Sequence, residues 1–391
     1  MPRVALIGPE LFPIPPIRGG ATEGFIEHLA RRLRRWQPVI ISPADPDLPL
    51  QSRQARVEYR RVPFSGWRRW LCKRYPGIFP FYNRGVAALV RELQPDLLHV
   101  HNRPLLASDL KSRFPELPVL LHMHNLYEIL GKRERPAPGA EIRVEGFVAC
   151  SHFVLERETG RLAKGAAARF VVYNGVDVQA FRPVWEQPDR AAALRRRYGL
   201  TEEPVVLFVG KIRESKGVGL LLKAMHSVWR RLPAAVLMLV GGTEFGRGRT
   251  QRQRFQAQVK AAPGRVILTG FVPPSEVPDY YLLGDIFVAP SQIHEGLPLV
   301  VLEASAGGLP IVTTKMGGIP EFVQPELNGI LLEHRDDPQE LADKILSLLG
   351  DPSRRQRLAR QGREWVLSNF SWEKIAEVQE HIYAQVAARR T

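Results

Sequence analysis

One stretch of this sequence decides the fold: Ser291-Gln292-Ile293-His294-Glu295-Gly296-Leu297-Pro298-Leu299-Val300-Val301-Leu302-Glu303. An apolar, strand-like run ends just before it, at about Pro290, and Pro298 suits the first turn of a helix. The stretch therefore predicts a strand, a loop and a helix in that order. The free amides of Gly296 to Val300 would form a helix N-terminus, which can hold a diphosphate.

Two glutamates accompany this predicted anion site. Glu295 lies in the loop, where a carboxylate can accept hydrogen bonds from sugar hydroxyls. Glu303 lies about one helical turn after Leu299 on the same face and could hold a ribose diol. The competing interpretation is that both are ordinary carboxylates at a helix start or on the surface. The spacing of the two glutamates alone leaves that interpretation open, and it is the complete stretch quoted above that disfavours it.

Strand-like and helix-like runs alternate along the whole chain. The predicted strands are Val4–Gly8, Pro38–Ile41, Leu97–Val100, Val119–His122, Phe147–Ala149 and Phe170–Val172 in the first half, and Val205–Val209, Val236–Val240, Val266–Leu268, Ile286–Ala289 and Ile311–Thr313 in the second. Such alternation is typical of parallel sheets buried on both faces. We therefore expect an α/β protein with two doubly wound domains, whose ligands bind outside the carboxyl ends of the strands.

The alternation breaks around Asn174-Gly175-Val176-Asp177, and three prolines follow within thirty residues. We place the domain boundary there, with a first domain at 1–173 and a second at 174–371. Three helical stretches are expected at the end of the chain, near 337–349, 352–368 and 372–388.

Composition favours a globular protein of the reducing cytoplasm. Of 391 residues, 45% are hydrophobic and 24% charged, and no run approaches the roughly 18 apolar residues of a membrane-spanning helix. No signal-peptide pattern precedes Val4. The two cysteines, Cys72 and Cys150, lie far apart in sequence, which excludes a disulfide scaffold or a cysteine-built metal site.

Positive charge is concentrated in the first half, because residues 1–173 carry +11 of the total formal charge of +15. A basic half indicates an anionic partner. The region Arg60–Tyr75 mixes cations with aromatics, which suits peripheral association with an anionic membrane surface, but equally a solvated arginine-rich face or nucleic-acid phosphate. Nucleic-acid binding explains none of the motifs that follow the strands, so no nucleic-acid partner is expected.

The glutamate pair with its Gly-Leu-Pro insert resembles the signature of glycosyltransferase family 4, retaining enzymes of the GT-B architecture. Further segments resemble that family in the expected order: Arg18-Gly19-Gly20, Val172–Asp177, Gly210–Gly217, Gly317–Glu321, Asn328-Gly329 and Phe370-Ser371-Trp372. The resemblance covers nearly the whole chain. It implies two Rossmann-like domains facing a cleft, the first binding the acceptor and the second the donor, with the last helix (about 372–391) returning to the first domain.

The same resemblance implies an activity: retaining transfer of a hexosyl unit from a UDP- or GDP-linked sugar to a glycan, lipid-linked or other cell-envelope acceptor. Glu295, His124 and Lys216 would be its catalytic residues. The family usually has arginine and then lysine at the diphosphate, whereas here Lys211 stands first, and Arg213 two residues later is a candidate to compensate. Gly19 and Gly20 would let the backbone approach a phosphate or sugar.

Four histidines form two His-x-His pairs at predicted strand ends, so the members of each pair share a face. A metal site is not favoured, because its geometry and second shell are not evident from the sequence. By resemblance, His124 lies by the transferred sugar and His101 near the acceptor, whereas His99 and His122 are interpreted as core or hydrogen-bonded structural residues. Asp45-Pro46-Asp47 is interpreted as a turn, so neither a metal nor another cofactor is expected.

Three other functions could be built on the same architecture. A nucleotide-sugar epimerase is usually distinguished by acidic residues that this sequence does not have at the expected places. A phosphorylase would require the sequence context of a pyridoxal-phosphate lysine, which is absent. A catalytically inactive scaffold, serving as a carbohydrate-binding or spore-coat protein, is the alternative of a different class. The intact Glu295, Glu303 and Lys216 argue against it.

Overall fold

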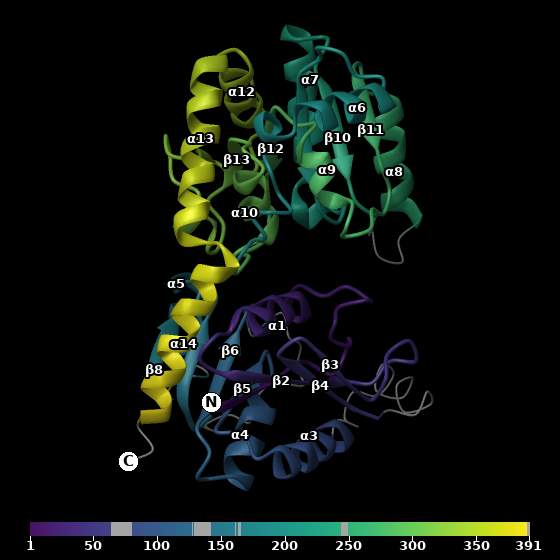
Figure 1. Cartoon of the computed structure of the whole chain (residues 1–391). Helices are drawn as coiled ribbons and strands as arrows, with labels where there is room; N and C mark the ends of the chain where they lie inside the picture. The colour runs from purple at the N-terminus through teal and green to yellow at the C-terminus, as the bar shows by residue number, and fades with distance from the viewer. Residues whose placement is uncertain are drawn as a thin grey trace. The chain divides into compact units, whose positions relative to one another are not determined.

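The computed structural model of the 391-residue chain describes residues 1–63, 80–126, 128, 142–160, 162, 166–243 and 249–388. The chain divides into two compact units, Met1–Gly175 with Trp372–Thr391, and Val176–Ser371 (Figure 1). The division thus falls after Gly175 rather than after residue 173. Within the described ranges, no helix is long and apolar enough to cross a membrane.

The first unit is built on an eight-stranded sheet in the order β3-β4-β2-β1-β5-β6-β7-β8. Neighbouring strands are parallel except for the antiparallel β3–β4 pair. The strands are β1 (Arg3–Ile7), β2 (Gln37–Pro43), β3 (Gln51–Gln54), β4 (Val57–Val62), β5 (Leu97–His101), β6 (Val119–Met123), β7 (Val144–Ala149) and β8 (Ala166–Val171), and the helices are α1 (Ala21–Arg32), α3 (Pro80–Leu93), α4 (Pro104–Arg113), α5 (His152–Thr159) and α14 (Trp372–Ala388).

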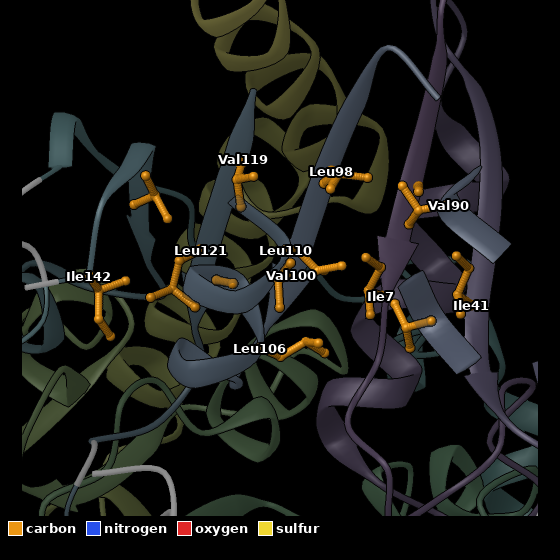
Figure 2. Close-up of a cluster of buried hydrophobic side chains, with 14 of the residues drawn as sticks. Ile7, Ile41, Val90, Leu98, Val100, Leu106, Leu110, Val119, Leu121 and Ile142 are labelled. Carbon is orange, nitrogen blue, oxygen red and sulfur yellow. The ribbon is translucent and has the colours of Figure 1, made fainter. Parts of the chain in front are cut away.

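Alternate residues of β1 and β5 enter two different cores, because successive side chains of a strand point to opposite faces. Ile7, Leu98 and Val100 pack with α3 and α4 in one core (Figure 2). Leu6 and Leu97 pack with α1 and α14 in the other. The histidines of β5 share the alternation of Leu97, so they belong to the face covered by α1 and α14.

The second unit has a six-stranded, entirely parallel sheet in the order β11-β10-β9-β12-β13-β14. The order reverses between β9 and β12, which in doubly wound sheets is where ligands bind. The strands are β9 (Val205–Val209), β10 (Val236–Val240), β11 (Arg265–Leu268), β12 (Ile286–Ala289), β13 (Ile311–Thr314) and β14 (Gly329–Leu332), and the helices are α6 (Pro188–Arg197), α7 (Val218–Arg231), α8 (Arg249–Lys260), α9 (Val277–Tyr281), α10 (Leu299–Ala306), α11 (Ile319–Phe322), α12 (Pro338–Leu349) and α13 (Pro352–Asn369).

The expected fold class is confirmed, and the final three helices begin and end within one residue of the predicted bounds. Three strands were not predicted: β3, β4 and β14. Strand β4 corrects the interpretation of Arg60 and Arg61 as the start of a surface segment. Arg61 is buried and donates to the carbonyl oxygen of Ile14 at 2.8 Å, while Arg60 pairs with Glu58 and Glu92. Residues 64–75 of the Arg60–Tyr75 region lie outside the described residues.

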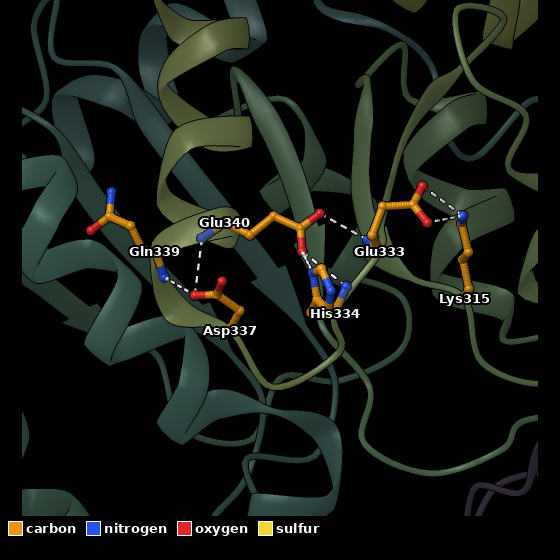
Figure 3. A network of polar contacts seen from close by, with 6 residues as sticks. All are labelled: Lys315, Glu333, His334, Asp337, Gln339 and Glu340. Carbon is orange, nitrogen blue, oxygen red and sulfur yellow. Dashed lines mark hydrogen bonds and ion pairs between the residues drawn. The ribbon is translucent and has the colours of Figure 1, made fainter.

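Polar contacts close the loop between β14 and α12 (Figure 3). The carboxylate of Asp337 accepts hydrogen bonds from two backbone N–H groups of the first helical turn, at 2.8 and 3.2 Å. The carboxylate of Glu340 reaches back to the N–H groups of Glu333 and His334, at 2.8 and 2.9 Å. Lys315 pairs with Glu333 at 2.6 Å. The two Asp337 bonds satisfy N–H groups of the first helical turn, which have no partner inside the helix.

Gly217 joins the loop after β9 to α7 in the left-handed conformation, with φ of 76°. A Cβ at this position would overlap the carbonyl oxygen of Pro290, at the end of β12. The N–H of Gln292 donates to the carbonyl oxygen of Ser215 at 3.0 Å. The loops after β9 and β12 therefore touch backbone to backbone at the point where the strand order reverses.

We expect Gly217→Ala to lower the free energy of unfolding by at least about 2 kcal/mol, because it adds a backbone overlap to left-handed strain. Gly270→Ala is the matched control, since Gly270 has a φ of 71° and nothing within 4 Å of its missing Cβ. That variant should lose only about 1 kcal/mol. Urea unfolding measures both, and equal losses would contradict the close approach.

Candidate active-site residues

The two loops at the strand reversal of the second unit hold most of the candidate residues of that unit. After β9 come Gly210, Lys211, Ile212 and Arg213, followed by the short 3-10 helix Glu214–Lys216. After β12 comes the loop that carries Glu295.

Lys216 and Glu295 form an ion pair, with Nζ and Oε2 2.5 Å apart. The two side chains are 24% and 16% exposed, so the pair is reachable from solvent. Glu295 is fixed by its backbone, because its carbonyl oxygen accepts from the N–H of Gly318 at 2.9 Å. Gly317, with φ of 64°, lies so close that a Cβ there would overlap the Glu295 backbone. The predicted cation and the predicted sugar-binding carboxylate are therefore brought together.

Lys211 and Arg213 flank the buried residue Ile212, whose N–H donates to the carbonyl oxygen of Gly242 at 2.9 Å. Lys211 is exposed, whereas Arg213 is half-buried and its Nε has no hydrogen-bond partner in the described part of the chain. Both cations thus lie beside Lys216 in the segment that follows β9.

Glu303 lies in α10 and accepts a hydrogen bond from the hydroxyl of Tyr281, at 2.7 Å between Oη and Oε2. Burial raises the pKa of Glu303 to about 7, and the Tyr281 hydrogen bond opposes that rise. Tyr281 is itself buried and packs edge-on against Phe181, with ring centroids 5.3 Å apart. Tyr281 therefore fixes one oxygen of Glu303.

Helix α10 begins at Leu299, one residue later than predicted, because Pro298 has an extended backbone with ψ of 131°. Gly296, Leu297 and Pro298 therefore lie in the loop rather than in the first helical turn. Leu299 and Val300 are the candidate residues whose amides lie in that turn, where no intrahelical acceptor precedes them.

In the first unit, Gly19 and Gly20 connect β1 to α1 with φ of 82° and 115°, values that favour glycine. A Cβ on Gly20 would overlap the carboxylate of Glu23, which is buried and whose pKa burial raises to about 7. Arg18 pairs with Asp45 at 2.9 Å and also with Asp47. Asp45-Pro46-Asp47 is a turn, as predicted, and its carboxylates hold the arginine next to the glycines.

The four histidines form two hydrogen-bonded pairs, His99 with His122 and His101 with His124, and the rings of one pair contact those of the other. Nε2 of His99 lies 3.2 Å from Nδ1 of His122, and Nδ1 of His101 lies 2.9 Å from Nε2 of His124. Within each His-x-His pair the ring centroids are 4.1 Å apart. Nδ1 of His99 also bonds to the hydroxyl of Tyr383 in α14, at 2.7 Å.

This geometry confirms His99 and His122 as buried, hydrogen-bonded residues. His101 is fully buried as well and bonds to His124 rather than facing solvent. Nitrogens of His99, His101 and His122 lie within 4.8 Å of one another. Both nitrogens of His99 already have partners, so a cation here would displace hydrogen bonds. Burial lowers the pKa of all four rings, that of His124 to about 3.

Sequence reasoning missed the residues that hold the candidates in place. Tyr281 bonds to Glu303 from 22 positions earlier, and Tyr383 bonds to His99 from 284 positions later. Asn102 accepts from the N–H of His124 at 2.8 Å. None of these residues belongs to a motif that predicts its partner. Asn102 has a positive φ of 54°, a conformation that asparagine tolerates better than most residues.

Sequence comparisons match both units to glycosyltransferases. Residues 19–180 match Glycosyltransferase Family 4, and residues 191–365 match Glycosyl transferases group 1. Spore coat protein SA of Bacillus subtilis is 29% identical over 386 residues, covering 96% of this chain and 97% of that protein. The putative glycosyltransferase YtcC of the same organism is 30% identical over 392 residues, covering 98% and 92%. A GDP-mannose-dependent alpha-(1-6)-phosphatidylinositol monomannoside mannosyltransferase of Mycobacterium tuberculosis is 35% identical over 208 residues, 52% of each chain.

Solved structures share the fold along the whole chain. Sucrose-phosphate synthase from Thermosynechococcus elongatus has a TM-score of 0.78 at 22% identity, covering 100% of both chains. Anabaena HepE in complex with UDP has a TM-score of 0.75 at 19% identity, covering 98% of this chain and 100% of that one. At these identities the likeness shows the fold alone.

The buried histidines predict acid sensitivity. Because their pKa values are lowered in the folded state, only the unfolded chain takes up these protons below pH 6.5, and stability is lost as pH falls. Each histidine contributes up to about 1.4 kcal/mol per pH unit. Urea unfolding of the wild type and His122→Gln between pH 7 and 4.5 measures the effect. The variant should show the shallower decline, and parallel curves would contradict the burial of a neutral ring.

Proposed function

The chain belongs to the glycosyltransferase family 4-like enzymes of GT-B architecture, and from that membership we propose that it transfers a hexosyl unit from a nucleotide-diphosphate sugar, with retention of anomeric configuration. The acceptor in this proposal is a glycan, a lipid-linked glycan or another cell-envelope molecule. The observation that carries the proposal is the Lys216–Glu295 ion pair at the strand reversal of the second unit.

The donor diphosphate gains negative charge as the glycosidic bond breaks, so its stabilisation is the main electrostatic demand. Lys216 meets that demand by exchanging the Glu295 carboxylate for a phosphate oxygen. Lys211 or Arg213 adds a second positive charge, and the amides of Leu299 and Val300 at the start of α10 donate hydrogen bonds. Glu303, held by Tyr281, accepts hydrogen bonds from the ribose diol.

Release from Lys216 leaves the Glu295 carboxylate to accept hydrogen bonds from hydroxyls of the transferred sugar. His124 is the proposed sugar contact on the first unit, and Gly19 and Gly20 the proposed acceptor loop. In the retaining step, the acceptor hydroxyl oxygen bonds to the anomeric carbon on the face of the departing diphosphate. The bond from that carbon to the phosphate oxygen breaks, and the hydroxyl proton passes to the departing phosphate.

The mycobacterial mannosyltransferase is GDP-mannose-dependent, which supports a guanosine donor. HepE, which shares the fold, is described with UDP, so a uridine donor is part of the proposal as well. Metal independence is supported by Asp45 and Asp47, the sequence's Asp-x-Asp pattern, because both pair with Arg18. The charge of +11 on residues 1–173 supports an anionic acceptor and contact with an anionic membrane surface. The low cysteine content supports a cytoplasmic location.

One comparison favours a second candidate function. The similarity to spore coat protein SA supports a role at a spore surface, and a catalytically inactive, carbohydrate-binding scaffold is the candidate that would fill it. Such a scaffold would have no need to neutralise a leaving diphosphate, so the cations of the second unit distinguish the two candidates.

The test is release of nucleoside diphosphate from a panel of uridine-, guanosine- and adenosine-diphosphate sugars in the presence of EDTA. We expect release from one donor, at least a hundredfold slower in Lys216→Ala and Glu295→Ala, because each removes a group that meets the developing charge or the sugar. Lys223→Ala, which changes an exposed lysine of α7, should keep the wild-type rate.

Silence with every donor, together with no thermal shift by any nucleoside diphosphate, would contradict the proposal and favour the inactive scaffold. Activity that appears only when a divalent cation replaces EDTA would contradict metal independence alone.

A further inference from the structure

The geometry points to Asn102 as a positioning residue that sets His124 and the Gly19-Gly20 loop at a fixed separation. This inference rests on the proposed roles of His124 and of that loop. Neither the sequence motifs nor the proposed mechanism assigns a role to Asn102.

Asn102 immediately follows β5, at the strand reversal of the first sheet between β1 and β5. Its side chain is buried and its φ is 54°, in the left-handed region that asparagine tolerates better than most residues. Its own N–H donates to the carbonyl oxygen of His122 at 2.8 Å. The backbone of Asn102 is thereby tied to β6, two residues before His124.

The side-chain amide of Asn102 bonds in two directions. Oδ1 accepts from the N–H of His124 at 2.8 Å, and Nδ2 donates to Oγ1 of Thr22 at 2.9 Å. Because a backbone N–H can only donate, the amide oxygen must face His124 and the nitrogen must face Thr22. One side chain therefore joins the end of β6 to the first turn of α1.

His124 is held from other sides as well. Its carbonyl oxygen accepts from Sγ of Cys150 at 3.2 Å, its Nε2 shares a hydrogen bond with His101, and its ring packs against Phe25 at 4.5 Å between centroids. The ring also hydrogen-bonds to the side chain of Asn174. These contacts orient the ring and the carbonyl group, and Asn102 holds the N–H.

Thr22 lies two residues after Gly20, so the Asn102 amide sets the distance between the two segments of the first unit that are proposed to contact ligand. A catalytic geometry held by hydrogen bonds to neighbouring elements is sensitive to their loss, because a displacement of about 1 Å can cost a hundredfold in rate. Asn102 acts on the reaction through His124 and the loop, and does not itself touch substrate.

The experiment is a double-mutant cycle of Asn102→Gly and Thr22→Val in the full-length protein. Glycine keeps the left-handed backbone and removes both amide bonds, whereas valine keeps the shape of threonine and removes the acceptor. Thr22→Ser restores a hydroxyl and serves as the rescue variant. Gln94→Gly is the matched control, because Gln94 is exposed and also has a positive φ, 47°.

Three quantities are measured for each variant: kcat/KM for transfer from the donor found in the panel, affinity for its nucleoside diphosphate, and hydrogen exchange of the His124 amide. We expect Asn102→Gly to lower kcat/KM by about tenfold to a hundredfold. Its nucleotide affinity should match that of the wild type, since the proposed diphosphate site is in the second unit. Its His124 amide should exchange faster. Thr22→Val should add little in the double variant, and Thr22→Ser should restore the rate.

The inference is overturned if folded Asn102→Gly keeps its kcat/KM within twofold, if the two losses simply add, or if the His124 amide stays protected. A loss of nucleotide affinity equal to the loss of kcat/KM would also overturn it, because that indicates general loosening of the protein. If the wild type transfers no sugar, the proposed function fails. The exchange rates of His124 in Asn102→Gly and Gln94→Gly then still decide whether the amide holds this residue.

Discussion

The site of the second unit depends on a backbone constraint at the reversal of strand order between β9 and β12. Two loops leave the sheet side by side there, and Gly217 lets one approach the carbonyl oxygen of Pro290. Gly317 lets a third segment approach the backbone of Glu295 in the same way. The Lys216–Glu295 ion pair joins side chains of two of these closely packed backbone segments. The charges are therefore placed by sheet topology and glycine, and not by the weak attraction of a partly exposed pair.

In the first unit, polar side chains are buried beside the ends of the strands. Four imidazoles on the face of the sheet covered by α1 and α14 are kept neutral, and hydrogen bonds pair them with one another. Pairing removes the free-energy cost of burying a polar atom, and among the nitrogens of these four rings only Nε2 of His101 and of His122 has no partner in the described residues. Tyr383 extends the network into α14, so the last helix contributes to the order of the histidines as well as to the apolar core.

Local patterns were sufficient for most of the strands, because runs such as Val205–Val209 and Val236–Val240 are apolar throughout and are each followed by a glycine. Strand β3 was missed because its residues, Gln51–Gln54, are polar and largely exposed at the sheet edge. The sequence also predicted which loops carry Lys216 and Glu295, but not that these side chains bond to each other. Tyr281 and Asn102 were beyond prediction, since their partners come from distant segments that only the folded chain brings together.

In the proposed mechanism, Glu295 is the resting partner of Lys216, and a donor diphosphate displaces it. The most direct measurement is the affinity of UDP and GDP for the wild type, Lys216→Met and Glu295→Gln by calorimetry. Loss of the lysine should remove about 1.5–3 kcal/mol of binding free energy, because a charge-assisted hydrogen bond is lost. Glu295→Gln should bind the nucleotide as tightly as the wild type or more tightly, because its lysine is already free. Equal weakening in both variants would contradict the exchange and the role of Lys216 as the diphosphate ligand.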